Sequence, residues 1–369
     1  MKYYDISKLL KVGKDAKYKM CFGERSNGKT FQILLYALKK YLKTGGEIAI
    51  MRRWQEDFKG KRAATYFDSL VCDGDGNNRI SELTKGKYDR VYYYSSRWYL
   101  ANFDEEQQKI IPAPNPFAYA FAISNMEHEK GNSYPYITTI FMDEFMTRGL
   151  YLPDEFILFM NSISTIVRSR DNVEIFMAAN TVSLYGNPYI KEMGLTHVNK
   201  MKKGEIEVYK YGDTGLQVAV EYCDSSNTFK PSDVYFAFNN EKIKLITEGA
   251  WEFDFFPHLL EKFDRKEIIF SYFIIYEEHI LQADIVLQKN RTFTFIHAKT
   301  TPIKNDEKDI IFTTDANPKY NYFGRLTKPT TKAGKKILYY FAANKVFYQD
   351  NEIGEIMSRY LAWSNGLQK

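Results

Sequence analysis

One short motif constrains this chain more than any other feature of its sequence. Residues 23–30 read GERSNGKT and match the pattern G-x-x-x-x-G-K-[ST]. The motif follows an apolar run expected to form a strand, Lys17–Phe22, and precedes Phe31–Lys43, where leucines recur at helical spacing. A strand, a glycine-rich loop and a helix N-terminus in this order predict a phosphate-binding site. The loop presents backbone N–H groups, and the helix dipole favours negative charge.

Every residue of this loop is a candidate for binding the phosphates of ATP. Lys29 is expected to neutralise the β- and γ-phosphates, and the Thr30 hydroxyl to bind Mg²⁺. Arg25 could also stabilise charge from within the same chain. The pattern therefore predicts ATP and Mg²⁺ as cofactors. The remaining candidates of the loop are Gly23, Glu24, Ser26, Asn27 and Gly28.

The carboxylates that such a site needs are expected at the end of another buried strand. Residues 137–144 read ITTIFMDE, an apolar run that ends in two acids. We expect Asp143 to bind Mg²⁺ through water and Glu144 to act as the general base on the attacking water. The next expected strand, Val173–Ala178, leads to Asn180, whose amide could contact the γ-phosphate or the attacking water. The alternative for Asn180 is a turn cap.

Two arginines lie at the end of the helix expected at Asp154–Ser169. Basic residues at a helix C-terminus are common because they suit the helix dipole, so Arg168 and Arg170 could be helix-end cations and no more. The alternative is an arginine finger, which one subunit presents to the ATP of its neighbour.

Composition favours a folded protein with more than one core. The chain has 369 residues, of which 44% are hydrophobic, and its net charge is only +5. No apolar run approaches about 18 residues, so no membrane span is expected, and the N-terminus lacks the apolar core of a signal peptide. The three cysteines are far apart and predict no disulfide framework. Without a basic tail, a polyanionic partner must be met by local clusters.

Three regions follow from the pattern along the chain. Residues 1–198 alternate short apolar runs with helical patterns, which predicts an α/β phosphate-loop ATPase domain. Residues 199–262 read as a small connector, and residues 263–369 as a β-rich α/β domain. Further strands of the first region are expected at Glu47–Arg52, Val91–Tyr94, Arg97–Asn102 and Ala118–Ile123. Later elements are expected at Glu205–Tyr211, Leu216–Tyr222, Ser232–Leu245, Ile268–Tyr276, His279–Gln288, Thr292–Ala298 and Asn351–Trp363.

Taken together, these blocks resemble the DNA-packaging ATPases of phi29-like bacteriophages, which are small relatives of the terminase large subunits. The resemblance covers most of the chain, is specific in residues 20–190 and is faint beyond. The blocks that carry it are GERSNGKT (23–30), IMRRW (50–54), KGNSYPYITTIFMDEF (130–145), IVRSRDNVEIFMAANTVSLYGNPY (166–189) and, more weakly, SYFIIYEEHILQADIVL (271–287) and NKVFYQDNEIGEIMSRYL (344–361).

The resemblance implies an additional-strand P-loop ATPase core, a small linker domain and a C-terminal domain of ribonuclease-H-like fold. It also implies a homomeric ring, expected to have five subunits, that acts transiently at the portal vertex of an empty prohead in the bacterial host cytoplasm and is absent from the mature virion. ATP hydrolysis would drive double-stranded DNA inward. In this family the first arginine of the pair acts in trans, which favours Arg168. An RNA ring joins such motors to the portal, and whether this chain needs one stays open.

Loops that line the pore of such a ring would contact DNA phosphates through lysine and arginine. Lys59, Lys61 and Arg62 form the best cluster, and Arg148 is the second candidate. An ordinary solvated face is the alternative for both. Gln55 departs from the family pattern, which has a basic residue there, so its role could have passed to Lys59 or Lys61.

Terminases of this kind often carry a nuclease in the C-terminal domain. A two-metal nuclease needs clustered carboxylates, and the expected strand at 268–276 has none. Glu277, Glu278 and Asp284 come later. We therefore expect a nuclease fold without nuclease chemistry that docks on portal or RNA, with a basic patch at Lys328, Lys332, Lys335 and Lys336. The rival functions are a terminase that also cuts DNA and a nucleotide-gated binding module that docks without translocating.

Residues 73–80 read DGDGNNRI and look like the start of a calcium-binding loop. The pattern fails at two demanding positions, because Asn78 replaces the turn glycine and Thr84 replaces the bidentate glutamate. A polar surface loop is the expectation here, and the five histidines show no metal-binding spacing.

Overall fold

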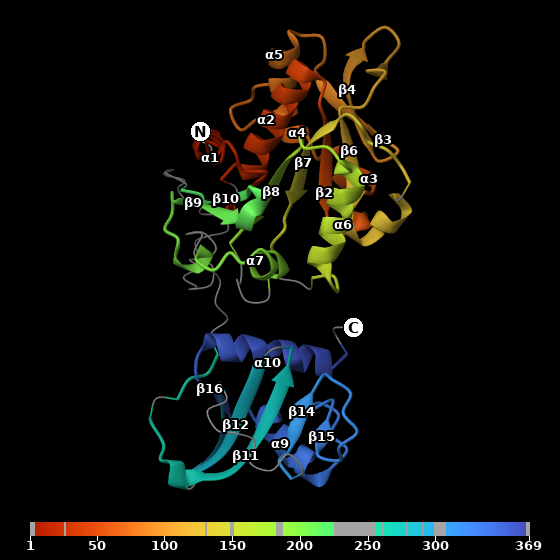
Figure 1. Ribbon diagram of the computed structural model, residues 1–369. Coiled ribbons are helices and arrows are strands. Elements are labelled where there is room, and N and C mark those ends of the chain that lie inside the picture. The colour runs from red at the N-terminus through yellow and green to blue at the C-terminus, as the bar shows by residue number, and fades with distance from the viewer. Residues whose placement is uncertain are drawn as a thin grey trace. The chain divides into compact units, whose positions relative to one another are not determined.

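The chain forms two compact units, Met1–Glu252 and Phe253–Lys369, each built around its own β-sheet (Figure 1). The structure is a computed structural model. It describes residues 4–25, 27–129, 131–147, 151–181, 187–224, 256–259, 261–277, 279–289, 291–298 and 308–366.

The first unit contains a ten-stranded sheet in the order β3-β4-β6-β2-β7-β8-β1-β10-β9, with β5 paired to β4. The six strands from β6 to β10 in this order run parallel, and antiparallel strands complete both edges. The strands are β1 (Tyr18–Gly23), β2 (Glu47–Arg52), β3 (Arg90–Tyr94), β4 (Arg97–Asp104), β5 (Lys109–Pro112), β6 (Ala118–Ala122), β7 (Ile137–Asp143), β8 (Glu174–Asn180), β9 (Ile206–Tyr211) and β10 (Leu216–Tyr222).

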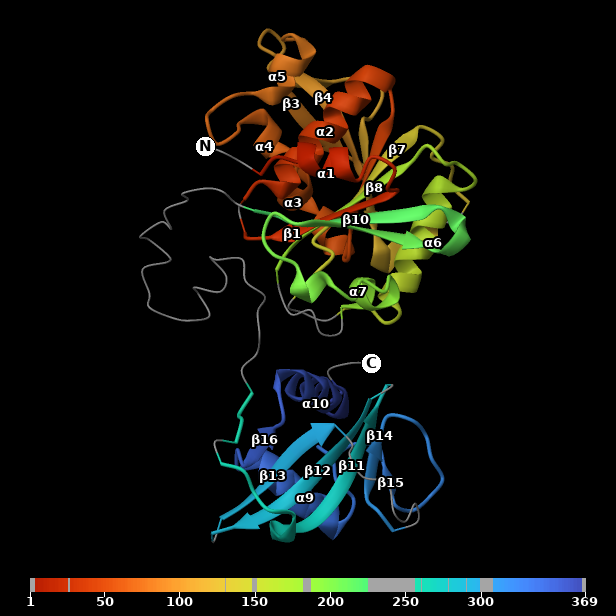
Figure 2. The same cartoon turned by 60° about the vertical axis from the view of Figure 1, so that its left-hand side comes forward.

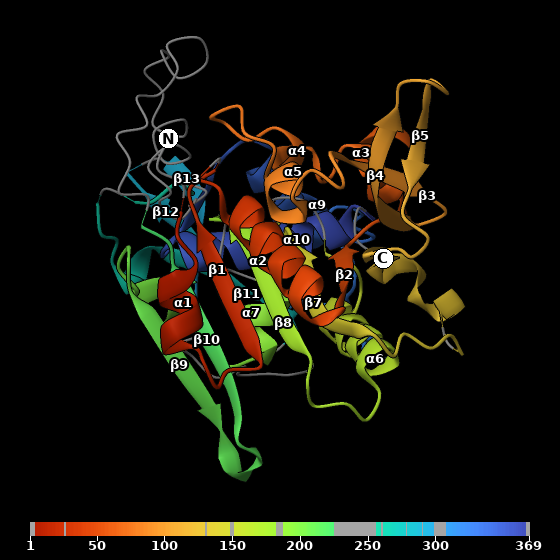
Figure 3. The same ribbon diagram turned by 90° about the horizontal axis from the view of Figure 1, so that it is seen from above.

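Helices cover both faces of this sheet, as Figure 3 shows for α2 on one side and α6 on the other. The central parallel strands are buried on both faces, which explains why they read as continuous apolar runs rather than as alternating ones. The helices of this unit are α1 (Ser7–Val12), α2 (Lys29–Thr44), α3 (Gly60–Ala64), α4 (Asp68–Val71), α5 (Arg79–Thr84), α6 (Glu155–Val167) and α7 (Pro188–Glu192).

Two hydrophobic clusters divide the core along the two faces. Ile33 and Leu38 of α2 pack with Phe141 and Phe176 on one face of the sheet. On the other face, Phe159 and Ile166 of α6 pack with strand residues that alternate with the first set, among them Met20, Met142 and Met177. Because side chains alternate along a strand, each central strand contributes to both clusters.

The strand order confirms the additional-strand arrangement. β8 lies between β1, which leads into the phosphate loop, and β7, which ends in Asp143. The expected α/β class is therefore confirmed, and the expected central strands and the helix α2 form within a few residues of their expected bounds. The short β5 and the short helices α3, α4, α5 and α7 were not expected, because segments of four to six residues carry too little periodicity to be recognised.

The hairpin expected in the connector forms, but it belongs to the first sheet. β10 pairs in parallel with β1, from Tyr18 with Val218 to Phe22 with Tyr222, and β9 pairs antiparallel with β10. The first sheet thus extends past residue 198, where we had expected the first domain to end. The helix expected at Ser232–Leu245 lies outside the described residues, and the three-domain division stays a prediction.

The second unit has a six-stranded mixed sheet in the order β15-β14-β11-β12-β13-β16 (Figure 2). Three antiparallel strands, β11 to β13, form its centre, and β14 runs parallel to β11. This mixed α/β sheet agrees with the ribonuclease-H-like fold that the resemblance implied. The elements are β11 (Ile268–Tyr276), β12 (His279–Gln288), β13 (Arg291–Ala298), β14 (Ile311–Thr313), β15 (Tyr322–Phe323), β16 (Val346–Tyr348), α9 (Lys332–Ala342) and α10 (Asn351–Ser364).

One glycine fixes how closely α10 approaches the segment that precedes β11. A Cβ atom added to Gly354 would lie 2.2 Å from the Phe256 ring, far inside van der Waals contact. Phe256 also packs on Tyr348 with ring centroids 5.3 Å apart. The aromatic ring therefore occupies the space that a side chain at 354 would need.

We predict that Gly354→Ala destabilises the second unit by about 1–3 kcal/mol through overpacking. In an exposed helix the same substitution would stabilise the protein, because alanine has the higher helix propensity. Calorimetric unfolding of the full chain measures the effect. In the Phe256→Ala background, Gly354→Ala should cost less stability than it does in the wild-type protein, because the ring that occupies the space is gone. An unchanged or raised unfolding temperature for Gly354→Ala would contradict the packing argument.

Candidate active site

The phosphate loop connects β1 directly to α2. Gly23 ends the strand with φ 156°, and Gly28 precedes the helix with φ 93°, both conformations that favour glycine. A Cβ at Gly23 would also lie 3.2 Å from the Cβ and carbonyl oxygen of Cys223. Backbone geometry therefore favours glycine at both positions of the motif.

The Lys29 ammonium lies inside this loop. Lys29 Nζ donates to the Glu24 carbonyl at 2.6 Å, to Asn27 Oδ1 at 3.0 Å and to Asn180 Oδ1 at 3.5 Å. Lys29 is buried, and this burial lowers its pKa from the ordinary lysine value. Buried cations need compensating partners, and here neutral oxygens provide them. A phosphate group would supply the negative charge that these oxygens lack.

The other loop residues take different positions. The Glu24 carboxylate pairs with Lys203 at 2.6 Å, so only its backbone carbonyl reaches Lys29. Asn27 is buried, and its carbonyl accepts a hydrogen bond from the backbone N–H of Tyr4 at 2.8 Å. Arg25 is exposed and is not among the residues that line the pocket. Ser26 lies outside the described residues.

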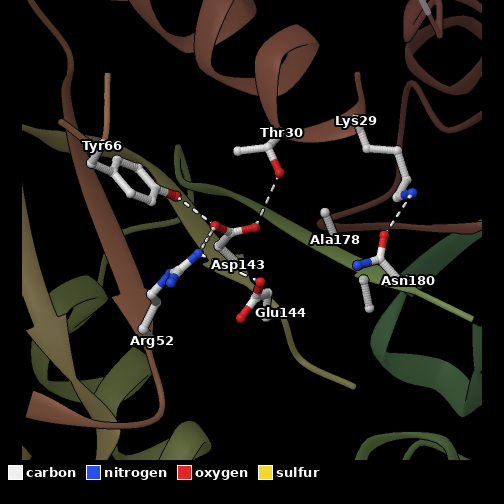
Figure 4. Close-up of a pocket in the computed structure, with 9 residues that line it drawn as sticks. Lys29, Thr30, Arg52, Tyr66, Asp143, Glu144, Ala178 and Asn180 are labelled. Carbon is white, nitrogen blue, oxygen red and sulfur yellow. Dashed lines mark hydrogen bonds and ion pairs between the residues drawn. The ribbon is translucent and has the colours of Figure 1, made fainter. Parts of the chain in front are cut away.

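Asp143, the last residue of β7, lies beside Thr30 in the lining of a pocket of about 220 Å³ (Figure 4). Thr30 Oγ1 donates to Asp143 Oδ1 at 3.2 Å. These two oxygen groups were the ones expected at a magnesium site, and they lie side by side. Because Mg²⁺ prefers hard oxygen ligands and keeps several waters or phosphate oxygens, one hydroxyl and one nearby carboxylate fit it well.

Glu144 also lines this pocket, directly after the strand ends. Its backbone is left-handed, with φ 60°, and its side chain is 62% exposed. The Arg52 Nη2 atom lies 3.8 Å from Glu144 Oε1. An exposed carboxylate beside the expected metal ligands is placed to accept a proton from water.

Asn180, the last residue of β8, is the fifth predicted residue that lines this pocket. Its amide oxygen faces Lys29 in Figure 4. Lys29, Thr30, Asp143, Glu144 and Asn180 thus all line one pocket. They come from α2 and from the carboxyl ends of β7 and β8, because parallel strands end at the same edge of a sheet.

Arg52 and Tyr66 line the same pocket and were not expected there. Arg52 Nη2 donates to Asp143 Oδ2 at 2.7 Å, and the Tyr66 hydroxyl donates to the same oxygen at 3.0 Å. The Arg52 guanidinium also lies 5.4 Å from the centroid of the Tyr66 ring. Burial, and then the Asp143 charge, raise the pKa of Tyr66 well above its ordinary value, so Tyr66 acts as a donor.

A signal for Arg52 was present in the sequence. It ends an expected strand in the IMRRW block, and its strand, β2, pairs with β7, so the rule that placed Asn180 applied to Arg52 too. Tyr66 had no comparable signal, because it lies between the short helices α3 and α4.

Arg168 and Arg170 lie at the other end of the sheet. Arg168 is the exposed C-cap of α6, and its Nη2 donates to the Asn132 carbonyl at 2.6 Å. The Arg170 guanidinium donates to five backbone carbonyls, two of them at 3.0 Å on Tyr134 and Pro135. All five donors of Arg170 are therefore used within its own chain. Neither arginine is among the residues that line the pocket.

The candidate DNA contacts are on the surface of α3 and beside it. Lys59, Lys61 and Arg62 are exposed, and Lys59 pairs with Glu56 at 3.3 Å. An exposed pair of this kind contributes little to stability and leaves the lysine accessible. Arg148 lies outside the described residues.

In the second unit, Asp284 of β12 is buried and bonded on both oxygens. It accepts from Ser271 at 2.6 Å and Gln282 at 3.0 Å, and His297 Nε2 lies 3.0 Å away. Burial by itself would raise the pKa of Asp284, but the bonds from His297, Ser271 and Gln282 lower it below its ordinary value. Glu277 is exposed, and Glu278 lies outside the described residues. Within the described part, no group of three or more His, Cys, Asp or Glu could bind a metal ion.

The calcium-like loop is closed by an arginine. Arg79 Nε donates to Asp73 Oδ2 at 2.7 Å, while Asp73 Oδ1 accepts from the backbone N–H groups of Asp75 and Asn77 at 2.9 Å each. The Asp73 carboxylate, which would bind the cation in a calcium loop, is thus bonded to a guanidinium instead. This agrees with the polar surface loop that we expected.

No helix among the described residues is long and apolar enough to span a bilayer.

Comparison with known proteins shows that the chain is similar to phage packaging proteins. Residues 114–228 match the family model described as Podovirus DNA encapsidation protein (Gp16). A DNA packaging protein of Bacillus phage B103 is 26% identical over 182 residues, which cover 48% of this chain and 48% of the relative. That of Bacillus phage phi29 is 25% identical over 202 residues, 54% of this chain and 52% of the relative. The matches thus span about half the length of these curated relatives.

Two solved structures show that the likeness in fold extends over nearly the entire chain. The bacteriophage Phi-29 viral genome packaging motor assembly contains a chain with a TM-score of 0.60 and 19% identity, covering 98% of this chain and 100% of that one. The Phi-28 gp11 DNA packaging motor gives a TM-score of 0.53 and 18% identity, covering 99% and 97%. The resemblance to the DNA-packaging ATPases of phi29-like bacteriophages, which the sequence motifs indicated, is thereby confirmed.

Proposed function

We propose that this chain is an ATP-hydrolysing motor that moves double-stranded DNA into a viral prohead. The observation that carries the proposal is the pocket that brings together Lys29, Thr30, Asp143, Glu144 and Asn180. A binding module that only senses nucleotide needs the first three of these residues. The two additional groups, an exposed carboxylate and an amide beside Lys29, are those that hydrolysis requires.

The chain's own residues divide the chemistry between them. The loop N–H groups and Lys29 bind the β- and γ-phosphates, and Thr30 with Asp143 would bind Mg²⁺, which neutralises phosphate charge when present. Asn180 orients the γ-phosphate or the attacking water, and Glu144 accepts the proton of that water. Arg52 and Tyr66 compensate the buried charge of Asp143.

Arg168 is proposed to act on the ATP of a neighbouring chain. α6 has 13 residues, which span about 20 Å. It begins at Glu155, which bonds to Arg53 beside the pocket, and ends at Arg168, which bonds to Asn132 ahead of β7. A side chain at that end lies too far from the pocket of its own subunit. The five backbone bonds of the Arg170 guanidinium support Arg168 rather than Arg170 as the finger.

The assembly follows from the family resemblance. We propose a homomeric ring, with five subunits as the expected number, at the portal of the prohead in the bacterial host. DNA phosphates would contact Lys59, Lys61 and Arg62, which are exposed. The second unit would dock on the portal or on a packaging RNA through four of its exposed lysines, namely Lys328, Lys332, Lys335 and Lys336. ATPase rates measured with and without double-stranded DNA test the motor against the nucleotide-gated module, which should turn over slowly and ignore DNA.

Glu144→Gln should retain ATP binding and lose turnover by about 10²-fold or more, because only the proton acceptor is removed. Lys29→Ala should lose binding itself, because the phosphates lose their cation. Equilibrium binding of a fluorescent ATP analogue and steady-state phosphate release separate the two effects. Normal turnover in Glu144→Gln would refute the assignment of the general base.

Arg168→Ala should leave ATP affinity near normal while turnover falls by about 10³-fold. Mixing Arg168→Ala with Glu144→Gln subunits should partly restore activity, because some interfaces then pair an intact Glu144 with an intact Arg168. Arg170→Ala is the matched comparison and should lower the unfolding temperature, because five carbonyls lose a donor. Rings shown to be mixed that remain inactive would argue against action in trans.

The second unit is proposed to lack nuclease activity, since both Asp284 oxygens are occupied by side-chain donors. Purified full-length protein should therefore leave supercoiled plasmid intact in Mn²⁺, as followed on agarose gels. Nicking that disappears in Asp284→Ala would favour the rival terminase that also cuts DNA.

A further inference from the structure

A buried ion pair lies directly behind the pocket and is not part of its lining. Arg53 follows the last residue of β2 and is 6% exposed, and the Glu155 side chain is fully buried at the start of α6. Arg53 Nε lies 2.6 Å from Glu155 Oε2, and Nη2 lies 2.7 Å from Oε1. Two parallel bonds of this kind fix the plane of the guanidinium.

The same guanidinium also bonds to the backbone that carries the proposed general base. Arg53 Nη1 donates to the Glu144 carbonyl at 3.4 Å, and Nη2 donates to the Phe145 carbonyl at 3.1 Å. Glu144 has a left-handed backbone with φ 60°. A non-glycine residue persists in that region only where its surroundings fix it, and the bonds from Arg53 are such a constraint.

Glu155 is in turn fixed from two further directions. Its Oε2 accepts from the Leu152 backbone N–H at 2.8 Å, and its Oε1 accepts from the Tyr189 hydroxyl at 2.7 Å. With the two bonds from Arg53, the carboxylate has four donors. Tyr189 is itself fully buried and packs edge-on against Phe145, with ring centroids 5.7 Å apart.

Stability alone is a poor explanation for such a pair. The free energy needed to remove two charges from water can exceed the free energy that a buried ion pair returns. Apolar residues of similar volume often give a protein of equal or higher stability. What apolar residues could not provide is a set of N–H donors aimed at two successive carbonyls. Lysine could not provide it either, because it lacks the planar fork of five donors.

We propose that Arg53, oriented by Glu155, is a positioning residue that fixes the turn at Glu144 and thereby aims its carboxylate into the pocket. The inference rests on the proposed function, since Glu144 must be the general base. Arg53 itself touches neither the pocket nor its contents and acts only through the backbone of residues 144 and 145.

The test compares Arg53→Lys with wild type in the full-length protein. Affinity for a fluorescent ATP analogue with Mg²⁺ should stay within about 3-fold, because Lys29, Thr30 and Asp143 are unchanged. Turnover should fall by about 10- to 100-fold, the scale expected when a catalytic group is displaced by an ångström or less. The matched control is Arg79→Lys, which replaces the guanidinium that lies 2.6 Å from Asp73 Oδ2. It should leave turnover unchanged.

A double-mutant cycle separates positioning from folding. In the Glu144→Gln background, Arg53→Lys should cost almost nothing further in single-turnover rate, because the carboxylate to be aimed is gone. If the role of Arg53 were purely structural, Arg53→Lys would lower the single-turnover rate by the same factor in both backgrounds and would lower the unfolding temperature. That result would overturn the proposal. Turnover of Arg53→Lys equal to wild type would overturn it as well.

If Arg53→Lys does not fold, Arg53→Met/Glu155→Met removes both charges and keeps the volume. A folded double variant that binds the ATP analogue and has lost turnover supports positioning, whereas full turnover contradicts it. The proposed function fails separately: wild type and Glu144→Gln would then hydrolyse ATP at the same rate. In that case the general base is elsewhere and this inference is wrong with it.

Discussion

The pocket depends on the bonds that three side chains donate to the Asp143 carboxylate. Its side chain is only 5% exposed, and a buried charge is stable only with partners. Three donors meet there, and each belongs to a different part of the chain: Thr30 opens α2, Arg52 ends β2, and Tyr66 lies between two short helices. One carboxylate therefore brings the phosphate loop, a neighbouring strand and a surface segment to the same point.

The order of strands in the sheet explains why these groups can meet at all. β2, β7, β8 and β1 are adjacent and parallel, so their carboxyl ends form one edge. Each strand contributes the residue at its end, namely Arg52, Asp143, Asn180 and Gly23. Residues more than a hundred positions apart in the chain thus become neighbours through backbone pairing alone, and the helix that follows β1 supplies Lys29 and Thr30.

The pocket residues that we predicted from the sequence all lie in the loop motif or at the end of a strand, although Arg52, which also ends a strand, was missed. Lys29, Thr30 and Asp143 follow from spacing and apolar runs, because strand ends have a fixed place in a parallel sheet. The contacts of Arg53 with Glu155, and of Tyr66 with Asp143, join segments whose relative positions depend on loop paths. No periodicity encodes such paths. For the same reason the hairpin β9–β10 was expected, but its pairing with β1 was not.

The direction of α6 along the sheet limits which copy of the chain Arg168 can act on. A helix that joins two parallel strands must run back along the sheet, from the edge where β7 ends to the edge where β8 begins. Arg168, at the C-terminus of that helix, is consequently placed away from the phosphate loop by topology, whatever its side-chain conformation. If this guanidinium takes part in hydrolysis, it must do so for another copy of the chain. A contact in which each copy gives an arginine to the next copy is a head-to-tail contact. Such contacts leave no unmatched end only where the copies form a closed ring, in which each pocket receives one arginine and each chain provides one.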